Sequence, residues 1–426
     1  MTDTAAPPRS AFGYRAFVMF WIGRIVSIFA FQMVVVAIGW QLYSMTGSAL
    51  DLGMLGIAQF VPMIVLTLAV GHVADRYDNR VILFLCQVSA ASAAALLALG
   101  TAMGWLSPLA IYAIMALLGA ARAFEIPTMV SIIPALVPRE LVPAGTAWFV
   151  SANQLGQIIG PVIGGLLYGF SGPSTVYGVA IVLWCIGAGC IFLIHMDKVT
   201  RSSEPLSISS LMGGFRFVWR DRVILGTISL DMCAVFLAAA TGLFPVFARD
   251  ILQTGPWGLG LLRAAPGLGA FVTSVLIARR PLTLPIGPLL FGVVTLFGIA
   301  TVVFALSTHL IVSLAALIVL GASDSVSVVI RFSLVQLRTP AEMRGRVSAV
   351  NSMFTGTSNY LGDFRAGAVA SVLGAVPAVL IGGAGLFAVA ALWMFLFPQL
   401  RRIRTYEDVP ASRALSADPS ERKPLP

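Results

Sequence analysis

Apolar residues in this chain gather into long stretches that short polar connections separate. The stretches cover 17–44, 52–73, 81–103, 107–136, 143–170, 174–195, 223–249, 256–279, 284–306, 308–336, 346–372 and 375–397. A helix needs about 20 mostly apolar residues to cross a hydrocarbon layer roughly 30 Å thick, and each stretch is long enough. The pattern therefore predicts an all-α membrane protein with twelve transmembrane helices, six on either side of a polar segment.

The polar breaks divide the chain into four predicted parts. These are an N-terminal six-helix half at 1–195, a cytoplasmic linker at 196–222, a C-terminal six-helix half at 223–397 and a tail at 398–426. Within the linker, apolar residues recur at helical spacing, which predicts an amphipathic helix along the membrane surface. They are Ile208, Leu211, Met212, Phe215 and Val218. The tail is rich in Pro, Ser and charge, so we expect it to be disordered.

A weak internal repeat relates the two halves. The segment 138–141 (PREL) resembles 340–343 (PAEM), and 153–156 (NQLG) resembles 359–362 (NYLG). Either match alone is within the reach of chance. Two matches separated by about half the chain indicate two pseudo-symmetric halves, an arrangement common among secondary transporters.

Composition excludes a soluble globular protein, because 58% of the 426 residues are hydrophobic and only 11% are charged. Soluble domains contain about 25% charged residues. Of the 27 lysines and arginines, 21 fall in the termini and the even-numbered connections, and the short connections on the other side contain none. The positive-inside rule then places both termini in the cytoplasm, for a multi-pass protein of the bacterial inner membrane. The same asymmetry explains the net charge of +9 without nucleic-acid binding.

Ionisable residues inside membrane spans are costly and are functional candidates by default. They occur in the first helix of every group of three, and the third helix of each group has none in its core. The candidates are Arg24 in span 1, Arg122 and Glu125 in span 4, Asp231 in span 7, and Asp324 and Arg331 in span 10. This period predicts that spans 1, 4, 7 and 10 line a central aqueous cavity and that the third helices face lipid alone.

The three carboxylates Glu125, Asp231 and Asp324 are candidate proton carriers, because burial favours the neutral form of a carboxylate and a nearby arginine favours the charged form. The three arginines are their partners or anchors for an anionic substrate. Asp324 is the preferred carrier, since the nearest cation in its own span, Arg331, lies seven residues on. The alternative is a set of structural ion pairs, in which Arg122 and Glu125 neutralise each other at i, i+3 spacing.

The connection between spans 2 and 3 reads GHVADRYDNR over residues 71–80. Its Gly71, Asp75, Arg76 and Arg80 resemble the signature loop of the major facilitator superfamily. Glycine allows close helix approach, and Asp75 can face the positive end of a neighbouring helix. The resemblance implies that this neighbour is span 11 and that the loop is a gate that latches the two halves. The alternative is an ordinary charged cytoplasmic turn.

Span 5 contains a stripe of small residues with a proline, which permits tight helix contact and a bend. The stripe consists of Gly156, Gly160, Pro161, Gly164 and Gly165. Ordinary membrane packing explains it equally well. It also resembles the antiporter motif of the superfamily, which implies export, and Arg122 takes the place of the superfamily's span-4 arginine, which is linked to proton coupling.

Two longer stretches, 39–51 and 324–359, resemble the bacterial exporter branch that includes the enterobactin exporter. The resemblance implies the major facilitator fold and a proton-coupled exporter, or antiporter, that moves a siderophore or drug by alternating access. Arg365 departs from the branch, where an acidic residue is usual, and this charge reversal predicts a change of substrate preference.

Other functions fit the sequence less well. The two lysines are not in a phosphate-binding loop, and no Gly-x-Ser-x-Gly segment is present, which argues against an enzyme. Histidines and cysteines are isolated, so we expect neither a metal nor a cofactor. The remaining alternatives are an importer of a small metabolite by proton symport and a non-transporting membrane scaffold or sensor. The expected partners are a small-molecule substrate, protons and the lipid bilayer, with the chain acting as a monomer.

Overall fold

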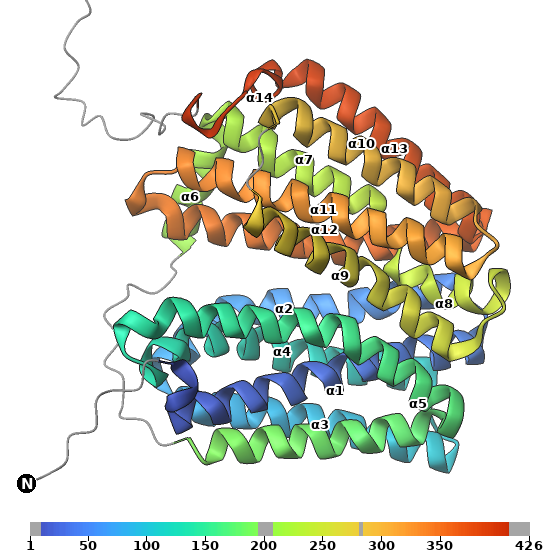
Figure 1. The fold of residues 1–426 in the computed structure, drawn as a ribbon. Helices are drawn as coiled ribbons and strands as arrows, with labels where there is room; N and C mark the ends of the chain where they lie inside the picture. Colours follow the sequence, from blue (N-terminus) through green and yellow to red (C-terminus); the bar gives the residue numbers. More distant parts are fainter. Residues whose placement is uncertain (1–9, 195–207, 281–283, 409–426) are drawn as a thin grey trace, which may run out of the picture. The chain divides into compact units, whose positions relative to one another are not determined.

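The computed structural model describes residues 10–194, 208–280 and 284–408, without the side chains at 67–72, 74–76 and 208–211. Within these ranges the chain is helical and contains no strand (Figure 1). The helices are α1 (Arg15–Thr46), α2 (Ala49–Arg76), α3 (Asn79–Met103), α4 (Pro108–Leu136), α5 (Val142–Phe192), α6 (Ile208–Arg220), α7 (Arg222–Ala238), α8 (Phe244–Val246), α9 (Gly255–Arg279), α10 (Ile286–Leu306), α11 (Leu310–Arg338), α12 (Arg344–Leu373), α13 (Ala375–Leu396) and α14 (Pro398–Arg402).

Ten helical segments of the described chain are long and apolar enough to cross a membrane. One of them, Arg139–Phe192, contains two spans, because α5 turns at Gly172, where φ is 76°. The ten do not include α12, which has 30 residues but is more polar than the others. With α5 counted as two spans and α12 added, the twelve predicted helices are present. The predicted fold class is confirmed.

The helices end where the sequence supplies caps. Gly47 ends α1 with a positive φ of 61°, and the hydroxyl of Ser48 accepts the N–H of Asp51 to begin α2. Gly104 and Ser107 do the same between α3 and α4. Glycine adopts this left-handed backbone without strain, and serine satisfies N–H groups that the first helical turn leaves unpaired. Short capped turns thus let consecutive spans follow one another with few polar residues between them.

The first compact unit contains the described chain up to Ile194 together with the segment Phe244–Ala264. In it α1 packs against α5, α5 against α3, and α4 against both α2 and α3 (Figure 1). Trp184 and Tyr177 are almost fully buried in its core, and the Tyr177 hydroxyl donates to Oε1 of Gln41 at 2.6 Å. A buried hydroxyl needs such a partner.

The segment Phe244–Ala264 follows α7 in the chain but docks on helices of the first unit. The hydroxyl of Tyr43, near the end of α1, donates to the carboxylate of Asp250. Arg249 donates to the carbonyl oxygen of Tyr43 at 3.2 Å. The early part of α9 contacts α5 at Gly165, where an added Cβ would lie 2.5 Å from the carbonyl oxygen of Pro256.

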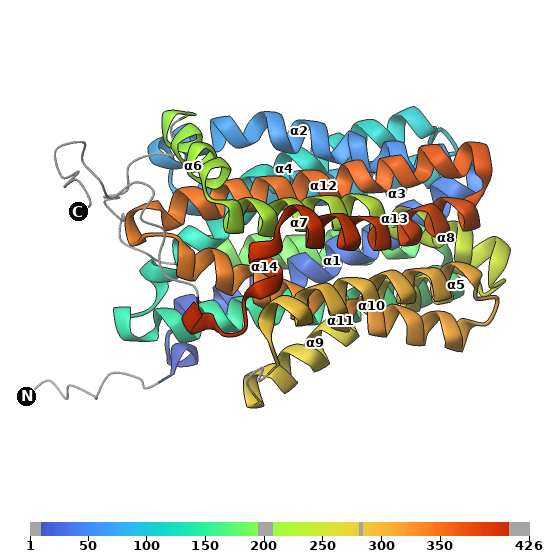
Figure 2. The same cartoon turned by 90° about the horizontal axis from the view of Figure 1, so that it is seen from above.

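The second compact unit comprises the described residues from Ile208 to Leu243 and from Ala265 to Asp408. In it α7 lies beside α12 and α13, and α10 packs against α11 and α13 (Figure 2). The short helix predicted in the linker is present as α6. Its Phe217 and Val218 are buried, whereas Trp219 is exposed, so part of its apolar surface packs on protein.

The predicted disordered tail starts too early. Residues 398–402 form α14, and Leu400 is buried against the second unit. The N–H groups of Ile286 and Gly287 donate to the carbonyl oxygens of Arg404 and Ile403. Backbone N–H groups of Thr405 and Arg404 donate to Asp408 and lower the pKa of its carboxyl. Residues 409–426 of the predicted tail lie outside the described chain.

The internal repeat has a structural counterpart in two glycines. A Cβ on Gly156 of α5 would lie 2.4 Å from Ile28 of α1, and a Cβ on Gly362 of α12 would lie 2.6 Å from Ala239, just after α7. Each glycine therefore lets the fifth helix of its half approach the first one closely. The two NxLG segments mark equivalent helix contacts.

Candidate functional site

Arg24 and Glu125 form a buried ion pair between α1 and α4. Nη1 of Arg24 lies 3.3 Å from Oε1 of Glu125, and the two side chains are 5% and 8% exposed. Arg24 also donates from Nε and Nη2 to Oδ1 of Asn153 on α5, at 2.8 Å for Nε. Buried charges persist when they are paired and their remaining hydrogen bonds are made. The pair therefore links three helices of the first unit.

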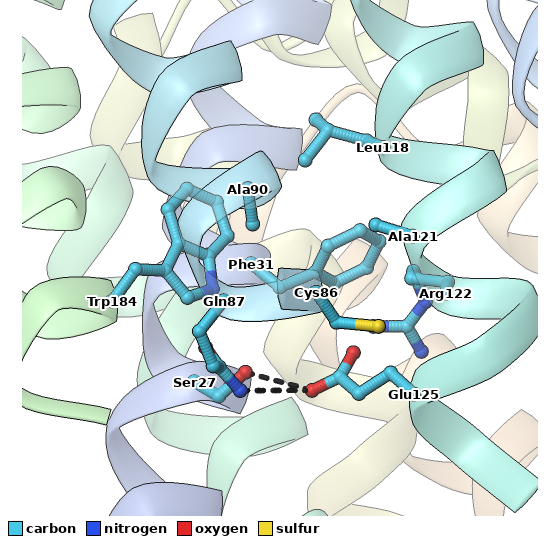
Figure 3. A pocket seen from close by; sticks show the side chains of 10 residues that line it. All are labelled: Ser27, Phe31, Cys86, Gln87, Ala90, Leu118, Ala121, Arg122, Glu125 and Trp184. Carbon is cyan, nitrogen blue, oxygen red and sulfur yellow. Dashed lines mark hydrogen bonds between the residues drawn. The ribbon is translucent and has the colours of Figure 1, made fainter. Parts of the chain in front are cut away.

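The carboxylate of Glu125 also collects donors from α1 and α3. Its Oε1 accepts the hydroxyl of Ser27 at 2.9 Å and Nε2 of Gln87 at 3.4 Å (Figure 3). These side chains line a small pocket together with Phe31, Cys86, Ala90, Leu118, Ala121, Arg122 and Trp184. Gln87 is 1% exposed, and its Oε1 has no hydrogen-bond partner among the described groups. The pocket thus contains one unused buried acceptor.

Arg122 projects into the same pocket from α4 (Figure 3). Its guanidinium carbon lies 3.9 Å from the centre of the Phe31 ring, a cation–π contact. The proposed neutralisation of Arg122 by Glu125 is wrong, because Glu125 pairs with Arg24. In the described part of the chain, Arg122 has no ion-pair partner. Arg24, Arg122 and Glu125 together carry one net positive charge when Glu125 is ionised.

A second ion-pair cluster lies in the second unit, between α7 and α11. Arg331 pairs through Nη1 with Asp231, and its Nη2 lies 3.6 Å from Oδ1 of Asp324. The hydroxyl of Thr355 on α12 donates to Oδ2 of Asp231 at 2.9 Å. The Arg331 and Asp231 side chains are 8% and 11% exposed, but Asp324 is 47% exposed. This cluster carries one net negative charge when both carboxylates are ionised.

The two clusters occupy equivalent helix positions with opposite charges. Arg24 and Asp231 are each the tenth residue of their helices, counted from Arg15 and Arg222. Arg122 and Asp324 are each the fifteenth, counted from Pro108 and Leu310. The sequence repeat did not reveal this relationship, because the residue types at these positions differ completely between the halves.

The span-5 stripe makes close packing contacts. A Cβ added to Gly160 or Gly164 would lie 2.7 Å from Gln32 or Met33 of α1. Gly260 of α9 faces Pro161 in the same way, with its added Cβ 2.4 Å from the proline carbonyl oxygen. These contacts support the packing explanation, and the link of the stripe to export stays a prediction.

Most of the predicted gate lies outside the described side chains, which do not include those of Gly71, Asp75 and Arg76. Arg80 is described: its Nη2 lies 2.8 Å from the carboxylate of Asp78, and its Nη1 donates to the carbonyl oxygen of Ile194 at 3.0 Å. Arg80 therefore joins the start of α3 to the end of α5, and the latching role of the loop stays a prediction.

Sequence reasoning missed the uncharged polar partners of both clusters: Ser27, Gln87, Asn153 and Thr355. Gln87 shows that the expected division of helices is wrong for α3, because this third helix contributes a buried amide to the polar pocket. Amides inside apolar stretches were the available signal. A search restricted to ionisable residues passes over them.

Comparisons with known proteins agree with this architecture. A family model described as "Transmembrane secretion effector", within the major facilitator superfamily, matches residues 6–420. The enterobactin exporter EntS of Citrobacter koseri is 28% identical over 408 residues, which cover 93% of this chain and 95% of that protein. Its counterpart from Escherichia coli O1:K1 is 27% identical over 402 residues, with 91% and 93% covered.

Solved transporter structures share the fold. A mutant of the nucleoside transporter NupG superposes with a TM-score of 0.71 at 15% identity, covering 90% of this chain and all of that one. A bacterial homolog of the human lysosomal transporter Spinster gives a TM-score of 0.71 at 14% identity, covering 94% and 99%. At these identities the likeness concerns the fold alone.

Proposed function

We propose, from the premise that the chain belongs to the transmembrane secretion effector family of the major facilitator superfamily, that it exports a small organic solute in exchange for protons. The chain is a multi-pass membrane transporter and not an enzyme, and its similarity to enterobactin exporters over most of its length supports export. Proton coupling, alternating access and the class of solute are proposals. The alternative is an importer that uses proton symport, and the tests below distinguish the two.

The observation that carries proton coupling is the unequal environment of two carboxylates around Arg331. Asp231 is buried, accepts the Thr355 hydroxyl and pairs directly with the guanidinium. Asp324 is half-exposed and lies farther from Arg331. Protonation of Asp324 leaves Arg331 with a charged partner, whereas protonation of Asp231 would remove the main partner of a buried cation.

Asp324 is therefore the group that can gain and lose a proton at low cost. The charge of the Asp231–Asp324–Arg331 cluster then changes between zero and minus one, and this change is what we propose to couple proton movement to the transport cycle. Interactions that differ between two states are what shift the balance between them. The buried partner, Asp231, keeps the cluster assembled in both protonation states.

The cluster of the first unit favours an acidic solute. Arg122 lies on the ring of Phe31, and its guanidinium has no anionic partner among the described residues. A guanidinium binds carboxylate, phenolate or phosphate oxygens with paired hydrogen bonds. Siderophores carry acidic groups of this kind, which agrees with the similarity to enterobactin exporters.

The first experiment uses bacterial cells whose own siderophore exporter has been deleted, grown in iron-poor medium. Iron-chelating solutes are quantified in the medium and inside the cells, with and without the protein. The variant Asp324→Asn removes the proposed carrier. Glu407→Gln, an exposed carboxylate outside the membrane spans, is the matched control.

The expected result is chelator release with the native protein and with Glu407→Gln, and retention with Asp324→Asn. Purified protein in liposomes tests coupling directly: a pH gradient should drive solute flux for the native protein and not for Asp324→Asn. Full gradient-driven flux by Asp324→Asn would overturn the assignment of Asp324. Uptake of a solute from the medium only when the protein is present would overturn export.

A further inference from the structure

The seventh membrane span is broken within a single apolar segment. This segment, Arg222–Ile251, is one of the ten membrane-spanning candidates, yet α7 ends at Ala238. Ala239 leaves the helical conformation with ψ of 117°, a short 3-10 turn covers Thr241–Leu243, and a π-helical turn covers Phe247–Ile251. Unpaired backbone groups in a membrane cost several kcal/mol each. The break therefore requires partners for the backbone groups it frees.

Arg365 of α12 supplies donors to the end of α7. Its Nε donates to the carbonyl oxygen of Phe236 at 3.2 Å, and its Nη2 donates to that of Leu237 at 2.6 Å. The last carbonyl groups of a helix lack partners within the helix and carry partial negative charge. An arginine there satisfies two of them at once. Arg365 thus contacts protein backbone, which gives the departure from the exporter branch a structural role.

Asp363, two residues earlier on α12, binds the other side of the break. Its Oδ1 accepts the N–H of Gly242 at 3.0 Å, and its carboxylate accepts the hydroxyl of Thr241 at 2.9 Å. Hydrogen bonds from neutral donors to a carboxylate are shorter and stronger than those between neutral groups. The acid and the base thus bind the two sides of one interruption.

Two glycines bring the neighbouring helices close enough for these bonds. A Cβ on Gly362 of α12 would lie 2.8 Å from the carbonyl oxygen of Phe236, and a Cβ on Gly382 of α13 would lie 2.3 Å from that of Leu237. Any side chain at either position would push its helix away from the break. The backbone of 236–242 is therefore enclosed by α12 and α13.

The break coincides with a boundary between the compact units. The chain passes from the second unit to the first between Leu243 and Phe244, directly after the residues that Asp363 binds. It returns between Ala264 and Ala265, next to Pro266 inside α9. Proline removes a helical hydrogen bond and favours a bend. The chain therefore passes between the two units at two places where the regular hydrogen bonding of a helix is interrupted.

We propose that Asp363 and Arg365 form a backbone clasp that fixes the break in span 7 and makes residues 240–244 the pivot for the segment 244–264 during transport. By holding the end of α7 in place, the clasp confines bending to the few residues after it. Asp363 and Arg365 are positioning residues, because they act through the backbone of span 7. Their proposed role does not depend on which solute is transported or on proton coupling.

Hydrogen exchange of the purified protein in lipid nanodiscs tests the clasp without any substrate. Arg365→Gln and Asp363→Asn should speed amide exchange in peptides covering 236–246 by about tenfold, since each removes charge-assisted hydrogen bonds. Arg365→Lys should restore part of the protection, because it keeps a cationic donor. Arg279→Gln, an exposed arginine at the end of α9, is the matched control.

Transport measurements then distinguish a pivot from a merely structural contact. The clasp variants should lower the maximal transport rate and leave the half-saturating solute concentration unchanged, because no solute contact is lost. Exchange at 236–246 equal to that of the control would overturn the proposal. So would a uniform rise in exchange throughout α7 and α12, which would indicate general loosening. If Arg365→Gln fails to accumulate, Arg365→Lys and Asp363→Asn decide the matter.

Discussion

Arg24 and Asp231 occupy the same position in the first helix of their respective halves but carry opposite charges. Each is held by an oppositely charged residue of the fourth helix, Glu125 in one half and Arg331 in the other. Both halves therefore have an ion pair between their first and fourth helices, but the helix that supplies the arginine in one half supplies the carboxylate in the other. The ion pair is thus a structural element that the two halves share. The placement of its charges differs, so the two pairs can have different functions.

The Arg24–Glu125 pair should behave as a buried pair in stability measurements. We expect Glu125→Gln to lower the free energy of unfolding by about 3 kcal/mol, because Arg24 loses its charged partner while buried. Thermal unfolding in detergent measures the change. The double variant Arg24→Met with Glu125→Met should recover most of the stability and still fail to transport. A double variant that transports normally would show that the pair has no function beyond stability.

The two aspartates near Arg331 should respond differently to the same substitution. Asp231→Asn is expected to destabilise the protein by about 3 kcal/mol, because it removes the direct partner of a buried arginine. Asp324→Asn should cost under about 1 kcal/mol, as expected for a longer contact of a half-exposed group. Unfolding temperatures of the two purified variants provide the comparison. Equal losses would contradict the division of roles between structure and proton transfer.

Close packing in span 5 can be tested with two glycines of the same helix. Gly164→Ala places a Cβ 2.7 Å from Cα of Met33, so we expect a loss of about 1–3 kcal/mol from overpacking. Gly169 has nothing within 4 Å of its added Cβ, and Gly169→Ala should be neutral or stabilising by up to about 1 kcal/mol. Thermal unfolding of both variants in detergent decides. If Gly164→Ala is no less stable than Gly169→Ala, the contact with α1 is not tight.

The hydrogen bond between Tyr43 and Asp250 joins α1 to the segment 244–264. Tyr43→Phe removes one bond to a charged acceptor, which is worth about 1.5–3 kcal/mol. We expect faster amide exchange in peptides covering 247–254, measured by mass spectrometry. Tyr168→Phe, whose hydroxyl makes no hydrogen bond among the described groups, serves as the control. Unchanged exchange in Tyr43→Phe would show that other contacts hold the segment.

Much of the fold could be predicted because membrane spans require a minimum apolar length. The C-terminal ends of α3, α4 and α13 lie within one residue of the predicted ends. The break in span 7 could not be predicted, because its stabilising residues are more than 100 positions away in the chain. The sequence around the break gives no indication of such a partner. The prediction that disorder begins at Pro398 was wrong for the same reason, because Leu400 packs on helices that are distant in the sequence.

The candidate site was predictable in its charged residues and not in their pairing. All six predicted charges fall into two clusters, three in each compact unit, and five of them form ion pairs. Helical spacing suggested that Arg122 pairs with Glu125, but the ion-pair partner of Glu125 is Arg24 of α1. Arg365 donates to backbone carbonyl groups of α7, a contact that its own span does not indicate, and its effect on substrate preference stays a prediction. In both cases the deciding neighbour lies on another helix, which spacing within one span cannot show.

The contact of Arg365 with span 7 also bears on the order in which the protein is made. The hydrogen bonds join residues 128 and 129 positions apart, so the ribosome completes span 7 long before it reaches α12. Until then, the carbonyl groups of Phe236 and Leu237 lack the guanidinium that satisfies them. Stabilisation of the break by α12 would therefore be a late maturation step, after insertion of span 7 and before the transporter first works.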